Sequence, residues 1–329
     1  MADDIPQEGA PPGMEMDPEF EPLPLGVWPF DPVTYPPEVH VLPPDSIRQF
    51  RSFVRGALED LLLREPKSHL SYDIAEYIEP PDDVHHIVDG ASFGIFCMGL
   101  SRLTASRPLL GALVERWWDT TDSFHISIVG EMTMTPFDFS MLTGIGVGGD
   151  PIPFDTDMGE WDAAQIFLLG IFPPLSRPGF VRYSWFKDQF RGQTPTTREE
   201  VKHYARGFFM FMLGTTLFAD RVNTVDLYLL SALVDMTRIR CYDWGGAGLA
   251  TLYGYMSSSS RRSGHLLGGY WRAWELWVYA YFPRLAPEPE VEMPPVVPYS
   301  HRYDVRCEQR PRESFLFFHR YFDTVAAAE

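Results

Sequence analysis

One segment near the middle of the chain, residues 198–219, restricts the fold more than any other. It begins with the charged run REEVK and ends with the almost wholly apolar run GFFMFMLGTTLFA. The spacing predicts one long helix, and a helix that is apolar on all sides has to be covered by other parts of the protein. The chain is therefore predicted to be built around a buried central helix.

Other segments carry helical spacing or the residues that start and end helices. Residues 46–62 place apolar side chains at helical intervals behind Ser46, which can cap the first turn. Thr135 and Pro136 are typical of a helix start, and Gly144 is typical of a helix end. Further helices are predicted at 107–118, 160–171, 225–236, 245–256, 266–282 and around 312–322. The predicted fold class is mainly α, a multi-helix bundle.

Residues 124–135, FHISIVGEMTMT, alternate apolar and polar side chains instead. This period of two predicts a small β-hairpin near residues 124–135 that turns near Gly130.

The first 45 residues contain ten acidic side chains, twelve prolines and no lysine or arginine. Proline cannot donate a backbone hydrogen bond, so helices and central strands are excluded there. The segment is predicted to be a disordered or strap-like tail, and the two alternatives stay open because 23–44 also carries aromatic residues. The domain division that follows is a tail at 1–45, one helical domain at 46–323 and a C-terminal tail at 324–329.

The net charge of −18 argues against nucleic-acid binding by phosphate neutralisation, which needs clustered lysine and arginine. Neither a secretory signal nor a membrane span is expected, because the apolar stretches are short or interrupted by charge. The three cysteines, Cys97, Cys241 and Cys307, lie far apart and none belongs to a CxxC pair. This pattern predicts neither a disulfide framework nor a zinc site, and it is typical of a protein from a reducing compartment.

The glycine-rich run at 144–149 raises the question of a nucleotide loop. Such a loop needs a strand before it and a helix start after it to hold the phosphates. A short predicted helix precedes this run and DPIP follows it, at 150–153. We therefore interpret the run as the exit from a helix.

The remaining polar candidates favour no catalytic, metal or cofactor site. Adjacent histidines point apart, so His85 and His86 with the neighbouring acids do not form a metal site; these acids are Asp82, Asp83 and Asp89. His125 is interpreted as a structural histidine on the polar face of the hairpin, because no motif places a nucleophile beside it. A third group, Asp155, Asp157 and Glu160, is interpreted as a solvated acidic loop. The serines at 257–260 with Arg261 and Arg262 are interpreted as a flexible basic segment.

Trp271, Trp274 and Trp277 recur every third residue in one predicted helix. Core packing is the favoured interpretation of this stripe. The alternative is a partly exposed aromatic groove for a peptide, since tryptophan often anchors interfaces.

Several runs occur in an order that is similar to the plant mobile domain family, also described as "aminotransferase-like, plant mobile domain". They are ALVERWW at 112–118, TDSFH at 121–125, GEMTMTPFD at 130–138, LTG at 142–144, ARG at 205–207, YDWGGA at 242–247, GGY at 268–270 and YFP at 281–283. The resemblance covers about residues 90–323.

The resemblance implies a nuclear, non-catalytic interaction module connected with transposon silencing, genome stability and meristem maintenance, with a serine/threonine phosphatase-like protein as partner. It supplies no catalytic residues. A pyridoxal site is not expected despite the family's label, because the lysines Lys67, Lys187 and Lys202 all lie in polar or charged stretches. The alternatives that stay open are a DNA-associated transposon protein, a metal-dependent hydrolase or nuclease, and a cytoplasmic location.

Overall fold

The structure is a computed structural model. It describes residues 80–99, 106–126, 129–220, 222–260, 268–287, 297–303 and 313–325. The chain divides into two units, Met1–Pro36 and Pro37–Glu329, and every described residue belongs to the second. The predicted tail at 1–45 and the predicted helix at 46–62 lie outside the described residues.

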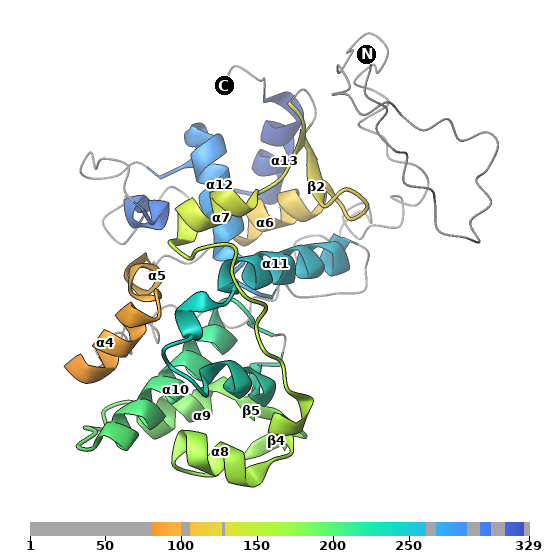
Figure 1. The fold of residues 1–329 in the computed structure, drawn as a ribbon. Helices are drawn as coiled ribbons and strands as arrows, with labels where there is room; N and C mark the ends of the chain where they lie inside the picture. Colours follow the sequence, from red (N-terminus) through yellow and green to blue (C-terminus); the bar gives the residue numbers. More distant parts are fainter. Residues whose placement is uncertain are drawn as a thin grey trace, which may run out of the picture. The chain divides into compact units, whose positions relative to one another are not determined.

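Helix α10 (Arg198–Thr215) is the predicted central helix (Figure 1). Thr197 and Glu200 form a reciprocal capping box at its start, and every residue from 204 to 215 is buried. Three other helices pack against it: α4 (Asp82–Gly90), α8 (Asp162–Leu169) and α9 (Tyr183–Phe190). The prediction of a covered central helix is confirmed.

A second group of helices packs around α11 (Trp244–Ser260) and α12 (Arg272–Tyr281). It contains α5 (Gly94–Gly99), α6 (Arg107–Val114), α7 (Pro136–Thr143) and α13 (Phe315–Thr324). One hydrophobic core joins both groups: the Phe93 ring lies 5.6 Å from that of Phe209 in α10 and 5.8 Å from that of Trp244 in α11. Short 3-10 turns connect these elements at Thr156–Gly159 (η3), Leu227–Leu233 (η4), Ile239–Cys241 (η5), Pro283–Leu285 (η6) and Tyr299–Tyr303 (η7).

The predicted hairpin is present as β2 (Ser123–Ile126) and β3 (Gly130–Met132), paired antiparallel with Phe124 opposite Met132. A third strand, β1 (Trp117–Trp118), pairs with β2. The predicted helix at 107–118 therefore ends four residues early, at Val114. The reason is tertiary packing, because the fully buried Trp117 ring lies 4.9 Å from that of Phe124.

A second antiparallel sheet was not expected from the sequence. It consists of β4 (Leu175–Arg177), β5 (Phe180–Arg182) and β6 (Thr224–Asp226) in that order. The predicted helix at 225–236 is wrong, because Val225 pairs with Val181 across the sheet and the 3-10 turn η4 follows. The described residues are mainly α-helical, with two small three-stranded sheets.

The stripe of tryptophans in α12 is mainly core. Trp274 and Trp277 are fully buried, and Trp271 is partly buried against the same core. The alternative of an exposed aromatic groove is therefore wrong for Trp274 and Trp277. None of the helices in the described ranges is long and apolar enough to cross a bilayer.

Candidate functional site

The outer face of helix α8 exposes apolar side chains. Gln165, Leu168 and Leu169 point into the protein and are buried. Ile166 and Phe167 point outward, and Phe167 is 73% exposed. A helix with two apolar faces is normally covered on both, but within the described residues only the inner face of α8 is covered.

Neighbouring segments extend this apolar area along the chain. Trp161, at the N-cap position of α8, is 59% exposed, and Phe154, ahead of η3, is 57% exposed. Ile171 and Phe172 follow α8 and are exposed as well. We call the set formed by these residues the α8 surface: Phe154, Trp161, Ile166, Phe167, Ile171 and Phe172, with the exposed carboxylates Asp155, Asp157, Glu160 and Asp162.

Buried polar contacts fix the position of α8. Arg206 of α10 is 4% exposed, and its guanidinium donates to the carbonyl oxygens of Leu168 (3.1 Å), Leu233 (2.9 Å) and Val234 (3.2 Å). Burial lowers the pKa of Arg206, an effect that Glu199 opposes. Helix α8 ends at Gly170, whose φ of 77° is left-handed, and this closes the helix beside the end of the apolar face.

The sequence stretch that contains α8 is acidic. From residue 117 to residue 176 the chain contains no lysine or arginine, and it contains nine acidic residues: Asp119, Asp122, Glu131, Asp138, Asp150, Asp155, Asp157, Glu160 and Asp162. The last four belong to the α8 surface. Asp155 also accepts a hydrogen bond from the backbone of Asp157 (2.9 Å) and caps η3. The predicted acidic loop is thus the charged part of an apolar surface, a combination that suits a basic, apolar partner.

Among the described residues, no group of three or more histidine, cysteine, aspartate or glutamate side chains could hold a metal ion. His85 lies in α4 with Nδ1 at 3.5 Å from the Asp89 carboxylate, and both side chains are exposed.

The glycine-rich run at 144–149 follows α7 and starts at Gly144, whose φ is 78°. The amide of Gly148 donates to the carboxylate of Asp243 (2.8 Å), which also accepts from Gly246 at the start of α11 (2.7 Å). A carboxylate of the chain itself therefore occupies backbone N–H groups that a phosphate would need. This geometry agrees with the interpretation of the run as the loop through which the chain leaves α7.

His125 is held by its neighbours in the first sheet. Its ring stacks on Trp118 with centroids 3.8 Å apart, and Nε2 lies 3.1 Å from Glu131. The Ser123 hydroxyl donates to the same carboxylate oxygen (2.5 Å). Burial favours a higher pKa for Glu131, but the hydrogen bonds from Ser123, Thr121 and His125 outweigh it and the pKa is lowered. The arrangement suits a structural role for His125.

The serines, arginines and lysines named as candidates from the sequence lie at separate places in the chain. Ser257 accepts a hydrogen bond from Trp117 Nε1 (2.9 Å) in the last turn of α11, where Ser259 and Ser260 are buried. Arg261, Arg262 and Lys67 lie outside the described residues. Lys202 pairs with Glu199 on the surface of α10 (2.6 Å).

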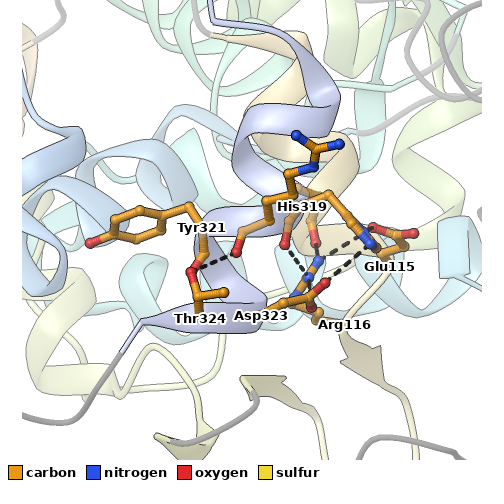
Figure 2. A network of polar contacts seen from close by, with 8 residues as sticks. Glu115, Arg116, His319, Tyr321, Asp323 and Thr324 are labelled. Atoms are coloured by element: carbon orange, nitrogen blue, oxygen red, sulfur yellow. Dashed lines mark hydrogen bonds and ion pairs between the residues drawn. The ribbon is translucent and has the colours of Figure 1, made fainter.

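A network that sequence reasoning missed joins α13 to the end of α6 (Figure 2). Buried Arg116 donates to the Asp323 carboxylate (2.5 Å) and to the His319 carbonyl oxygen (2.8 Å), and Glu115 lies 2.8 Å from His319 Nδ1. The partners are more than 200 residues apart, so no local pattern could have identified them. The apolar outer face of α8 was missed for another reason, because its sequence is typical of a buried helix.

Comparison with known proteins gives consistent matches. A family model described as plant mobile domain matches residues 93–329. Protein MAIN-LIKE 2 of Arabidopsis thaliana is 29% identical over 71% of this chain and 38% of its own length. Protein MAINTENANCE OF MERISTEMS of the same plant is 31% identical over 59% of this chain and 41% of its own length.

A further relative in Arabidopsis thaliana is Serine/threonine-protein phosphatase 7 long form homolog. It is 29% identical over 59% of this chain, and the match covers 14% of its own length. The chain thus spans less than half the length of each of these three relatives. No solved structure matches the chain significantly.

Proposed function

The chain belongs to the plant mobile domain family, and on that premise we propose that it is a non-catalytic protein-interaction module whose α8 surface binds a basic amphipathic segment of a partner. The observation that carries the proposal is the apolar outer face of α8, held in place by the buried Arg206.

The first argument is the free energy of the exposed side chains. Several large apolar side chains are exposed on and beside this one helix, and exposed apolar patches commonly mark interaction sites. Fully burying a side chain such as Phe167 or Ile166 is worth about 1.5–3 kcal/mol. Aromatic residues also supply much of the affinity of protein interfaces. A partner that covers Trp161 and Phe167 would gain both contributions.

The second argument concerns the chemistry of the partner. Four exposed carboxylates accompany the apolar side chains, and the chain contains no lysine or arginine between residues 117 and 176. A segment with lysine or arginine beside an apolar face would satisfy both parts of the surface. An acidic segment would be repelled.

The relatives support a modular role. Matches to this chain cover parts of longer proteins, including 14% of one whose name is that of a phosphatase. One relative is named for the maintenance of meristems. We extend the proposal to a role in meristem maintenance and transposon silencing in the nucleus, with a serine/threonine phosphatase-like protein as a candidate partner.

A peptide-display selection on the purified full chain tests the α8 surface. Random 16-residue peptides are selected on the unaltered chain, on Phe167→Ser and on Leu316→Ser, which removes a similarly exposed side chain of α13. We expect peptides with lysine or arginine beside spaced apolar residues from the unaltered chain and from Leu316→Ser, but not from Phe167→Ser. Enrichment of the same peptides on all three proteins would contradict the proposal, as would a selection that yields acidic peptides.

A further inference from the structure

A cavity of about 340 Å³ lies among β5, β6, the start of η4 and α11. Its walls are mostly apolar and include three phenyl rings. The lining residues are Ile152, Phe154, Phe180, Phe218, Asp220, Thr224, Asp226, Leu229, Ala247 and Thr251. Its volume is near the lower end of small-ligand sites, which run from about 300 to about 1,000 Å³, so one side chain or a similarly small molecule fits it better than a large cofactor.

The two carboxylates in this lining differ in how far they are engaged. Asp220 accepts from the backbone of Val222 (3.0 Å) and from both the backbone (2.8 Å) and the hydroxyl (2.5 Å) of Thr224, so both of its oxygens organise the turn. Asp226 caps η4 by accepting from Tyr228 through Oδ1 (3.0 Å). Its Oδ2 accepts no hydrogen bond from the described residues, so Asp226 is the less engaged of the two lining carboxylates.

Burial raises the pKa of Asp226, although the Tyr228 hydrogen bond and nearby Arg177 oppose this. A half-buried carboxylate beside apolar walls has lost part of its hydration, and a neighbouring cation compensates for that loss. Arg177 already supplies part of this compensation, and an uncharged apolar ligand would remove the remaining water without adding to it. The chemistry of this wall therefore favours a cation.

The phenyl rings suit the same ligand. A cation over an aromatic face is attracted by the negative face of the ring. The chain itself provides an example at the edge of the cavity, where the guanidinium carbon of Arg177 lies 3.6 Å from the centroid of Phe180. Phe180 is the strand partner of Asp226, so this ring and this carboxylate are neighbours in the sheet.

We propose that the cavity binds the side chain of a lysine or arginine, with the alkyl stem against the phenyl rings and the charged group beside Asp226. Phe154 lines the cavity and also belongs to the α8 surface. The basic side chain would therefore come from the segment that binds α8, and this part of the inference rests on the proposed function. The preference of the cavity for a cation does not rest on the proposed function.

Three small probes separate charge from apolar fit: the Nα-acetyl methylamides of arginine, lysine and norleucine. Norleucine has an alkyl side chain like that of lysine but no amine. Binding to the full chain is followed by NMR, with the backbone amides of Ala247 and Thr251 as reporters. We expect saturable shifts with at least one of the two cationic probes and, for it, an affinity about fivefold or more above that of norleucine.

Two variants locate the effect. Asp226→Asn should remove the preference for the cation and still fold, because asparagine also caps helices well. Phe180→Leu should weaken the cationic probes while norleucine is unaffected, since it keeps the apolar wall but removes the aromatic face. Asp188→Asn, an exposed carboxylate of α9 outside both the cavity lining and the α8 surface, is the matched control and should bind like the unaltered chain. A thermal melt of each variant confirms that it is folded.

Equal affinity for norleucine, an unchanged preference in Asp226→Asn, or no saturable binding of either cationic probe would overturn the inference. Phe167→Ser separates it from the proposed function. If this variant loses the displayed peptides but binds the cationic probes normally, the cavity is a site in its own right. If the unaltered chain binds basic peptides but none of the probes, only the cavity inference fails.

Discussion

The guanidinium of Arg116 donates a hydrogen bond of 2.5 Å to the carboxylate of Asp323, across 207 residues of sequence (Figure 2). Arg116 also bonds to the carbonyl oxygens of Ala112 (2.9 Å) and His319 (2.8 Å), and it lies at 5.4 Å from the ring of Phe322. One buried side chain thus connects the end of α6 to two turns of α13.

Arg116→Met should lower the free energy of unfolding by about 3 kcal/mol, because it leaves buried acceptors without their cation and leaves the buried Glu115 side chain with His319 as its remaining basic partner. Urea unfolding measures the change. Asp323→Asn is the matched control, since Asp323 is largely solvent-exposed, and a loss below about 1 kcal/mol is expected. Equal losses in the two variants would show that Arg116 is not the main connection.

Arg206→Met should loosen α8 in particular. The change removes the donors of the buried Leu168 and Leu233 carbonyl oxygens and of the part-buried Val234 carbonyl oxygen, and an unsatisfied buried acceptor costs about 1–3 kcal/mol. We expect lower stability and faster amide hydrogen exchange in α8 than in α13. Lys202→Met, which breaks only an exposed pair with Glu199, should leave exchange in α8 unchanged. Similar exchange rates in both variants would argue against Arg206 as the support of the α8 surface.

Glu131 should make stability depend on pH. Its pKa is lowered in the folded protein, so its contribution is complete above the ordinary carboxyl pKa of about 4.3 and is lost as the pH falls through the folded value. Glu131→Gln should therefore lower the melting temperature at pH 6 and have a smaller effect at pH 3. Thermal melts across this range measure the difference. A constant difference would mean that the charge of Glu131 does not contribute.

The cysteines should differ in reactivity. Burial, with a smaller effect from Asp89, raises the pKa of the Cys97 thiol to about 12, and a thiol reacts as its thiolate. Cys241 is exposed. After treatment of the folded protein with iodoacetamide at pH 8, peptide mass spectrometry should find Cys241 modified and Cys97 unmodified. In denaturant, where Cys97 becomes accessible, both cysteines should be modified. Modification of Cys97 in the folded protein at a similar rate would show that this part of the core opens readily.

Binding of a basic peptide to the α8 surface should weaken as salt increases, because ions screen exposed charges. The double variant Glu160→Gln with Asp162→Asn should bind more weakly at low salt and show a shallower salt dependence. Fluorescence anisotropy with a peptide from the display selection provides the measurement. Asp188→Asn, an exposed carboxylate of α9, should retain the original salt dependence. If the double variant also retains it, these carboxylates do not attract the partner.

Local patterns in the sequence predicted the parts of the fold that local physics controls. The helix start at Thr135 and Pro136 and the apolar end of α10 belong to short stretches of chain, and the structure confirms them. The β2–β3 hairpin is similarly local. Strand β6 was missed because its partner β5 lies far back in the sequence, beyond α9 and α10. Strand β1 was missed because packing of the buried Trp117 ring on Phe124 outweighs the local helix propensity.

By itself, the sequence determined the mainly α class, the covered central helix and the resemblance that the family match confirmed. Periodicity shows which side chains share a face of an element, but it does not show what covers that face. Only the tertiary structure decided that Trp274 and Trp277 are core while Phe167 faces solvent, and that Asp226 meets three phenyl rings in one cavity. Those outcomes depend on contacts between segments far apart in the chain, and an apolar pattern in one helix does not encode its neighbours.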